Sequence, residues 1–107
     1  MKPGDVVVGV LEGAVETKVR PGVVIASTVY LAERPDVLVG ILTTRPPKPA
    51  ASSDCLLQDW QADGLRAESY FRAYVLTVHR SELTIIGHLS NRDWSRVVAC
   101  VDNAFAK

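Results

Sequence analysis

The sequence predicts a mainly β protein: a small, curved, largely antiparallel barrel that ends in one α-helix. Short apolar runs rich in β-branched residues recur along the chain, separated by polar segments that contain glycine or proline. The last segment instead repeats its apolar residues at three- and four-residue spacing. A length of 107 residues, without internal repeats or low-complexity stretches, predicts a single domain over residues 1–107.

Three strands are expected in the N-terminal half. Val6–Leu11 is apolar at nearly every position, as in a strand that is buried on both faces or belongs to a closed barrel. Glu12–Arg20 is polar and contains a glycine, so we interpret it as a loop. Pro21-Gly22 then leads into a strand over Val23–Ala26, and a third strand covers Val37–Leu42.

Connecting segments separate these strands from the rest of the sheet. Thr28–Asp36 is a connector with room for one helical turn, and Trp60–Glu68 is a turn or short helix. Arg45–Ser53 contains three prolines, which lack the N–H donor of a strand, so it is a projecting loop. The remaining short elements are strands over Asp54–Leu57, Tyr70–Val78 and Thr84–Ile86, and a helical turn over Arg80–Leu83.

The final helix is the clearest predicted element. Ser90 is a typical N-cap, and Asp93 occupies the third position after it, as in a capping box. One apolar face should pack on the sheet. It consists of Trp94, Val97, Val98, Val101 and Phe105.

Composition narrows the classes of function. Twelve Lys and Arg balance twelve Asp and Glu, which argues against a protein that coats DNA by neutralising many phosphates. A local basic cleft for a short piece of RNA remains compatible with zero net charge. No apolar run is long enough to cross a membrane and the N-terminus has no leader-like apolar core, so a cytoplasmic location is expected.

The metal-binding residue types are sparse. Cys55 and Cys100 each lie among apolar residues, so two buried, reduced thiols are favoured over a disulfide. There is no CxxC pair, and His79 and His88 are nine positions apart. A metal site and a cofactor are therefore not expected.

Four stretches carry a resemblance to a known family. They are Lys2–Val7, Val19–Ile25, Gly40–Thr44, and a discontinuous set that runs from Gly64-Leu65 through Ser69 and Arg72 to Ile86–Ser90 and the final helix. In order and spacing, the four together resemble the MazF/PemK toxins of type II toxin–antitoxin systems. The resemblance covers almost the whole chain, although no single stretch is specific.

The resemblance implies both a fold and an activity. The fold is a small SH3-like antiparallel β-barrel of the MazF/PemK/CcdB type that forms a homodimer. The activity is that of an mRNA interferase, an endoribonuclease that cuts single-stranded RNA at a short sequence without a metal ion. The implied partner is a cognate antitoxin whose extended tail blocks the RNA groove, with DNA contacted only through that antitoxin. We expect the antitoxin between the Glu12–Arg20 and Thr44–Ser53 loops.

Matched by position, Arg20 and Thr43 correspond to the family's two catalytic residues. The resemblance also points to a set of substrate-binding residues. They are Glu16, Lys18, Thr44, Arg45, Ser69 and Arg72. The stretch Gly13–Thr17 departs from the family pattern because it is shortened, which affects the part of the site that closes on RNA.

The chemistry explains why these residue types would serve. Attack by the 2′-hydroxyl on the adjacent phosphate gathers negative charge on the phosphoryl oxygens, and a guanidinium binds two such oxygens at once. Without the resemblance, an exposed surface arginine would be the favoured interpretation of Arg20; with it, the catalytic role is favoured. Thr43 could donate its hydroxyl to a phosphate oxygen, but Thr44 competes for this role because adjacent strand residues point to opposite faces.

The general acid and base are left open by the sequence. Histidines have suitable pKa values, but nothing in their spacing joins His79 to His88, and Glu16 is a second candidate base. Trp60, Tyr70 and Phe71 could stack on bases, although a place in the core or a dimer interface is preferred.

Two other functions fit the same barrel. One is a non-enzymatic toxin that poisons gyrase, which does not need Arg20 with Thr43. The other is a barrel that binds RNA or peptide without turnover. Because function depends on the site rather than the fold, only the geometry around Arg20 can separate these hypotheses.

Overall fold

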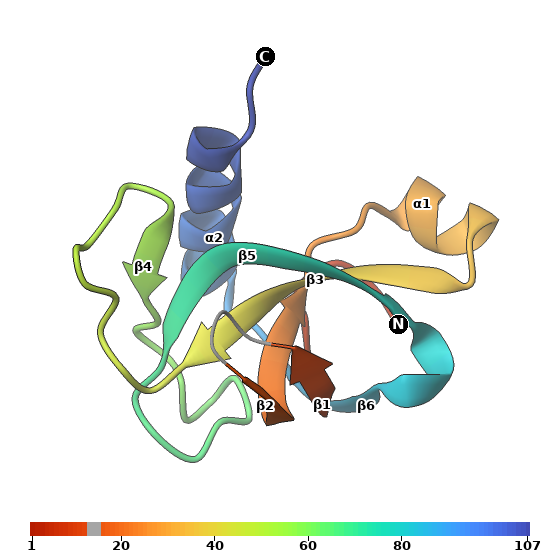
Figure 1. The fold of residues 1–107 in the computed structure, drawn as a ribbon, viewed down its shortest axis with the longest axis horizontal. Helices are drawn as coiled ribbons and strands as arrows, with labels where there is room; N and C mark the ends of the chain where they lie inside the picture. The colour runs from red at the N-terminus through yellow and green to blue at the C-terminus, as the bar shows by residue number, and fades with distance from the viewer. Residues whose placement is uncertain (13–15) are drawn as a thin grey trace.

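The computed structural model describes residues 1–12 and 16–107, which form one curled antiparallel sheet with helices beside it (Figure 1). The elements are β1 (Asp5–Glu12), β2 (Thr17–Val24), α1 (Thr28–Glu33), β3 (Asp36–Thr43), β4 (Asp54–Leu56), β5 (Tyr70–His79), the 3-10 turn η1 (Arg80–Glu82), β6 (Thr84–His88) and α2 (Asn91–Ala104). The strand order is β4-β5-β3-β2-β1-β6. The predicted mainly β barrel fold with a C-terminal helix is confirmed as a half-barrel of six strands.

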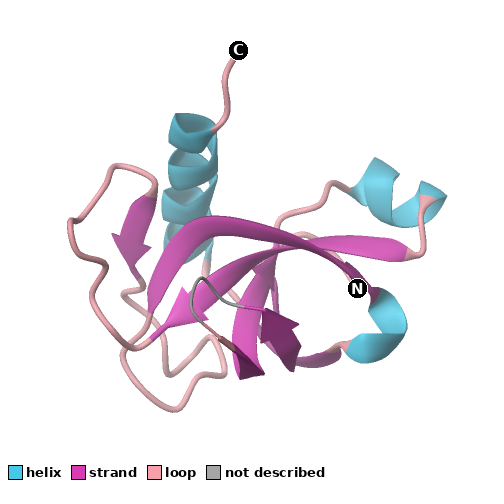
Figure 2. Ribbon diagram, in the orientation of Figure 1, coloured by secondary structure: helices cyan, strands magenta, loops and turns pink. Residues whose placement is uncertain are grey.

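The sheet separates two apolar cores, because consecutive strand residues point to opposite faces. Val6 and Leu42 belong to one cluster, whereas their neighbours Val7 and Ile41 belong to the other. Helix α2 covers the first cluster with Val97 and Cys100, and α1 closes part of the second with Leu31 (Figure 2). A cavity lined in part by Ile41 and Tyr74 opens beside the second core.

The predicted loop over Glu12–Arg20 is wrong for its second half. Thr17–Val24 is a strand that pairs with β1 along its length, from Glu12↔Thr17 to Val6↔Val23, whereas Gly13–Val15 lie outside the described residues. Polar residues are tolerated here because this end of the hairpin is largely exposed. Pro21 is tolerated because pairing between β2 and β3 begins only at Gly22, so its missing N–H interrupts no bond to β3.

Two burial predictions need correction. In β1, Val6 and Val7 are buried on opposite faces, but Val10, near the end of the strand, is 67% exposed. On α2, Val97 packs as expected, yet Val98 and Phe105 are exposed. Cys100, one turn beyond Val97, takes the core position instead, and Phe105 is the C-cap rather than a helical residue.

The capping box at the start of α2 is half right. Ser90 Oγ accepts a hydrogen bond from the backbone N–H of Asp93 at 3.3 Å, as expected of an N-cap. The Asp93 carboxylate, however, does not return to Ser90. It accepts the backbone N–H groups of Gln58 and Asp59, both at 2.8 Å, so it fastens a distant loop to the helix.

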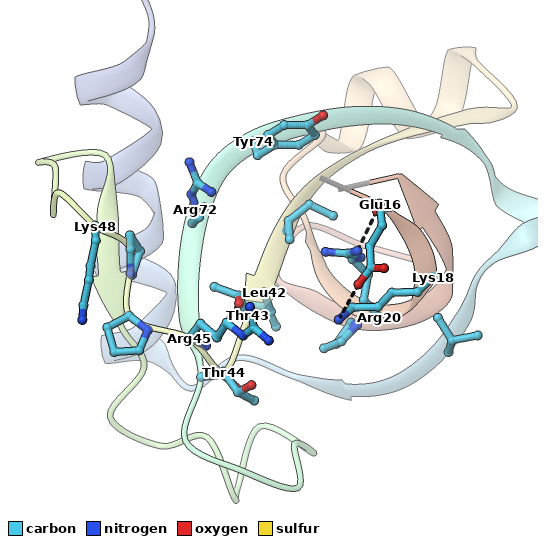
Figure 3. A pocket seen from close by; sticks show the side chains of 16 residues that line it. Glu16, Lys18, Arg20, Leu42, Thr43, Thr44, Arg45, Lys48, Arg72 and Tyr74 are labelled. Carbon is cyan, nitrogen blue, oxygen red and sulfur yellow. Dashed lines mark hydrogen bonds and ion pairs between the residues drawn. The ribbon is translucent and has the colours of Figure 1, made fainter. Parts of the chain in front are cut away.

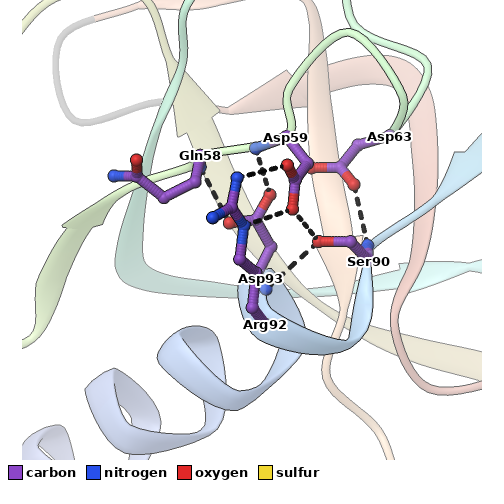
Figure 4. A network of polar contacts seen from close by, with 6 residues as sticks. All are labelled: Gln58, Asp59, Asp63, Ser90, Arg92 and Asp93. Carbon is purple, nitrogen blue, oxygen red and sulfur yellow. Dashed lines mark hydrogen bonds and ion pairs between the residues drawn. The ribbon is translucent and has the colours of Figure 1, made fainter.

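We call the residues that surround this contact the acidic network (Figure 4). Its members are Gln58, Asp59, Asp63, Ser90, Arg92 and Asp93. Asp63 and Asp93 are completely buried, and Asp63 Oδ1 accepts the backbone N–H of Ser90 at 2.8 Å. Arg92 donates to both carboxylate oxygens of Asp59, at 2.6 and 2.7 Å, while Ser90 Oγ donates to the same carboxylate at 2.6 Å.

Two carboxyl groups of the acidic network have pKa values shifted in opposite directions. The hydrogen bonds from Arg92 and Ser90 lower the pKa of Asp59 to about 2. Burial, followed by the hydrogen-bonded carboxyl of Asp93, raises the pKa of Asp63 to about 7. Asp63 Oδ2 accepts no hydrogen bond within the described residues, and a proton on this oxygen can donate to Asp93.

The cysteines are free thiols, as the sequence favours, with Cys100 buried and Cys55 half-buried. Burial, together with a hydrogen bond to Cys100, raises the pKa of Cys55 to about 12, so the thiol stays protonated. Within the described residues, no helix has the length and apolar character needed to cross a membrane.

Candidate active site

The candidate site lies where two neighbouring strands part. Pairing between β2 and β3 runs through Val24↔Val39, Val23↔Gly40 and Gly22↔Ile41 and then stops. Beyond this point β2 pairs only with β1, and β3 only with β5. Continuing the register by two residues would set Arg20 opposite Thr43. The two predicted catalytic residues therefore lie on the two strands that border the gap, each two residues beyond the last pair.

Gly22 sets the last contact before the gap. A Cβ at this position would lie 2.4 Å from Cγ1 of Val39 and 3.0 Å from the carbonyl oxygen of Gly40. Only a glycine allows β2 to approach β3 so closely here. The strands are thus held together at Gly22 and separate directly after it.

The gap opens into a cavity of about 380 Å3, which we call the cationic pocket (Figure 3). All eight residues that the sequence singles out for catalysis or substrate binding line it. They are Glu16, Lys18, Arg20, Thr43, Thr44, Arg45, Ser69 and Arg72. The remaining described lining residues are Val19, Pro21, Ile41, Leu42, Pro46, Pro47, Lys48 and Tyr74.

Charge is strongly concentrated in the cationic pocket. Five of its described lining residues carry a cation and one, Glu16, carries a carboxylate, although the whole chain has no net charge. Glu16 forms an exposed ion pair with Lys18, in which Glu16 Oε1 lies 3.4 Å from Lys18 Nζ. An excess of fixed cations around a cavity draws in anions such as phosphate groups.

Arg20 is held in place from one side. Its Nη2 donates to the backbone carbonyl oxygen of Glu16 at 2.8 Å, which ties the guanidinium to the start of β2. Its Nε is buried and has no hydrogen-bond partner within residues 1–12 and 16–107. A buried donor without a partner is costly, so it calls for an explanation such as a catalytic role or a bound water or ion.

Thr43 and Thr44 differ in how they meet the cationic pocket. Thr43 is half-buried at the end of β3, and its Oγ1 accepts the backbone N–H of Arg45 at 3.2 Å. This bond uses a lone pair and leaves the hydroxyl proton to donate elsewhere. Thr44 is exposed and lies beyond the strand. The geometry therefore favours Thr43 as the hydroxyl donor.

Solved structures of other proteins share this arrangement of elements. An endoribonuclease from a mycobacterial species, in complex with its cognate antitoxin, is 17% identical and matches with a TM-score of 0.80 over 97% of this chain and 93% of its own. The Mycobacterium tuberculosis toxin MazF-mt6 is 19% identical, with a TM-score of 0.75 over 94% of this chain and 95% of its own.

The chain has the MazF fold. A MazE–MazF complex from Deinococcus radiodurans, 11% identical with a TM-score of 0.73, likewise covers 97% of this chain and 94% of its own. No family model and no curated protein matches the amino-acid sequence. The fold that four short stretches of sequence predicted is thus the fold of these three structures, although each is less than 20% identical to this chain.

Within the MazF fold, Arg72 and Ser69 approach the cationic pocket from β5 and the segment before it. Arg72 Nε lies 3.8 Å from Asp54 Oδ1 on β4, so its charge is partly balanced. Ser69 is buried, and its hydroxyl donates to the carbonyl oxygen of Ala67 at 2.9 Å. Ser69 therefore shapes the pocket wall, whereas Arg72 presents a cation to it.

The histidines lie outside the described lining of the cationic pocket. His79 Nδ1 accepts the backbone N–H of Ser81 at 3.1 Å and caps η1. His88 Nδ1 lies 2.9 Å from Asp5 Oδ1. Burial alone would raise the pKa of Asp5, but the hydrogen bonds from His88 and Lys2 hold it below its usual value. Both histidines thus have structural contacts of their own.

Sequence reasoning missed some of the residues that line the pocket of this MazF fold. Lys48, which falls in the segment predicted to be a projecting loop, is one of its five cations. Tyr74 was not singled out. Of the three aromatic residues that were, Phe71 is in the core, Trp60 packs against it, and Tyr70 is half-buried opposite Thr43. Tyr74 lies two residues after Arg72 on the predicted strand Tyr70–Val78. This spacing places the two side chains on the same face and could have identified Tyr74.

Proposed function

We propose that this protein is a sequence-specific endoribonuclease toxin of a toxin–antitoxin system that cleaves single-stranded RNA without a metal ion. The observation that carries the proposal is the convergence of Arg20 and Thr43 in one cationic pocket at the split between β2 and β3. Support comes from proteins with the same fold, which include endoribonucleases and MazF toxins seen with antitoxins.

Arg20 would stabilise the transition state. When the 2′-oxygen bonds to phosphorus, negative charge grows on the non-bridging oxygens, and a guanidinium already fixed by Glu16 needs no reorganisation to neutralise it. The buried Nε, which has no partner among the described residues, is the donor that a phosphoryl oxygen would satisfy. Lys18, Arg45 and Arg72 would hold the flanking phosphates.

Thr43 and Glu16 would complete the reaction. The Thr43 hydroxyl donates to a second phosphoryl oxygen while the Arg45 N–H fixes its orientation. Glu16, the one carboxylate among the described lining residues, takes the proton of the attacking 2′-hydroxyl. The P–O5′ bond then breaks and the 5′-oxygen takes up a proton, leaving a 2′,3′-cyclic phosphate and a 5′-hydroxyl.

The cationic pocket also defines the expected protein partner. An antitoxin segment that carries carboxylates would compete with RNA for the same cations. It would lie between the Glu12–Arg20 and Thr44–Ser53 segments, whose described parts both contribute lining residues. We further propose that the toxin acts as a homodimer in the cytoplasm.

The test is incubation of the purified protein with long single-stranded RNA in EDTA, with analysis of the new ends. We expect cleavage, 5′-ends that a kinase labels without phosphatase treatment, and loss of cleavage in Arg20→Ala. Arg66→Ala, an exposed arginine outside the described pocket lining, is the matched control and should cleave normally. Intact RNA at a large excess of folded protein would refute the enzymatic proposal and favour a binding barrel.

A further inference from the structure

Tyr74 lines the cationic pocket two residues after Arg72 on β5, so the two side chains share one face of the strand. Between β3 and β5 the register passes from Gly40↔Val75 to Ile41↔Arg72, so β5 has two more residues than β3 here, Ala73 and Tyr74. Side chains keep alternating through this irregularity, because Ala73 packs on the first core cluster and Tyr74 on the second. Tyr74 projects from β5 beside the pocket, on the far side from Thr44 (Figure 3).

Tyr74 is half-buried between the second core cluster and the cationic pocket. The ring packs against the second core cluster, which includes Ile41, and it keeps part of its surface exposed. Ile41, the register partner of Arg72, also lines the pocket and forms part of its buried floor. Tyr74 is the one aromatic residue among the described lining residues.

The cationic pocket therefore has two chemically different parts. Arg20, Thr43 and Arg45 offer donors and charge, whereas Tyr74 and Ile41 offer an aromatic and aliphatic wall. A phosphate ion would use only the first part. A nucleotide of a single strand uses both, because its phosphate is anionic and its unpaired base has a π-face that stacks on aromatic side chains.

We propose that Tyr74, backed by Ile41, forms a nucleobase subsite on which one unpaired base beside the bound phosphate stacks. This inference rests on the proposed function and adds to it. Stacking accepts any base, so the subsite selects unpaired nucleotides over duplex rather than one base over another. Tyr74 is thus a residue that positions substrate and takes no part in proton transfer.

The experiment combines Tyr74 variants with an RNA that lacks one base. Tyr74→Leu removes the aromatic ring and keeps an apolar side chain, while Tyr74→Phe keeps the ring. Tyr30→Leu is the matched control, since Tyr30 packs against the same core cluster from α1, outside the described pocket lining. Cleavage is measured on a short RNA mapped with the wild-type protein, with and without an abasic nucleotide next to the cut. Affinity is measured by fluorescence anisotropy on fully 2′-O-methylated single strands, which cannot be cleaved.

We expect Tyr74→Leu to raise KM and Kd roughly 10-fold with little change in kcat, and Tyr74→Phe and Tyr30→Leu to behave as wild type. On the abasic strand, wild type and Tyr74→Leu should become equal, a coupling that a merely structural role of Tyr74 would not produce. Equal KM and Kd for Tyr74→Leu and wild type on the intact strand would overturn the inference and leave the ribonuclease proposal standing.

The binding arm separates the two proposals. Wild-type protein that binds the 2′-O-methylated strand through Tyr74 but cleaves no RNA would support the nucleobase subsite and refute the endoribonuclease. Protein that cleaves RNA with no coupling between Tyr74 and the base would do the reverse. If Tyr74→Leu weakens binding of an acidic aromatic peptide but not of RNA, the wall serves a protein partner and the inference fails.

Discussion

The acidic network and the cationic pocket are two polar regions in which side chains from distant segments meet, and they treat their polar atoms differently. In the acidic network, the Asp93 carboxylate takes two backbone N–H groups and Asp59 takes donors from both Ser90 and Arg92. In the cationic pocket, Arg20 makes one hydrogen bond to a backbone carbonyl and leaves a buried Nε without a described partner.

We propose that the acidic network serves the fold and that the cationic pocket serves a ligand. The carboxylates of the acidic network fix the loop before β5 to α2, and among the described residues only Asp63 Oδ2 lacks a hydrogen bond there. The cationic pocket gathers like charges whose mutual repulsion is relieved by a bound anion. Substitutions in the two regions should therefore separate activity from stability.

The largest expected effect is in the cationic pocket. Arg20→Lys keeps the charge but loses the planar fork that binds two phosphoryl oxygens, so the cleavage rate should fall roughly 10²-fold. The midpoint of thermal unfolding should change little, because a single hydrogen bond to Glu16 is lost. Single-turnover cleavage and calorimetry on the same preparation check both. A rate within threefold of wild type would contradict the assigned role.

A substitution in the acidic network should have the opposite result, a loss of stability without a loss of activity. Asp93→Ala leaves the backbone N–H groups of Gln58 and Asp59 without their acceptor, which should lower the free energy of unfolding by about 3 kcal/mol. Cleavage at a temperature where the variant stays folded should match wild type. Urea unfolding provides the stability, and a variant that is stable but inactive would show that the two regions are not separable.

A smaller effect distinguishes the two adjacent threonines. Thr43→Val preserves shape and removes the hydroxyl, so the cleavage rate should fall roughly 10-fold by loss of one neutral donor. Thr44→Val, the exposed neighbour, should leave the rate near that of wild type. The ratio of the two single-turnover rates is the measurement, and a larger loss in Thr44→Val would reverse the assignment.

A further expected effect is a pH dependence of stability. The pKa of Asp63 is raised from its usual 3.8 to about 7, so the folded state holds a proton that the unfolded chain releases. This contribution is complete below pH 3.8 and is lost as the pH rises to about 7. Asp59, with its pKa lowered to about 2, contributes in the opposite sense, and its part is lost as the pH falls from 3.8 to about 2.

Unfolding free energies measured between pH 4 and 8 should therefore decline more for wild type than for Asp63→Asn. The asparagine side chain can still accept the Ser90 N–H and donate to Asp93, but it does not titrate in this range. Parallel curves for the two proteins would mean that Asp63 is ionised in the folded state.

Sequence patterns predicted most of the fold because they are local. The 3.6-residue period and the Ser90 cap located α2, and the apolar runs located β1, β3 and β5. The second half of the 12–20 segment was missed because a polar, proline-containing strand at an exposed hairpin has no apolar periodicity to reveal it. Its pairing with β1 depends on tertiary context.

The candidate site was predicted residue by residue through resemblance, and its roles remain to be tested. What no local pattern could supply is the relation between its parts. The position of Arg20 relative to Thr43 depends on the β2–β3 register, and Tyr74 lies in a part of β5 that has two more residues than β3 between Gly40 and Ile41. The long-range use of Asp93 was hidden for the same reason, since its partners lie more than thirty residues away in the chain.

The early end of pairing after Gly22 has a consequence for how such a molecule can diverge. Side chains alternate along a strand, so one residue inserted between Arg20 and Gly22 would swing the guanidinium to the other face of the sheet. The number of residues between Arg20 and Gly22 is therefore more tightly constrained than the identities of the residues elsewhere in the chain. Two structures with the same fold are only 11 and 19% identical to this chain, whereas a one-residue insertion at that point would take the Arg20 side chain out of the cavity.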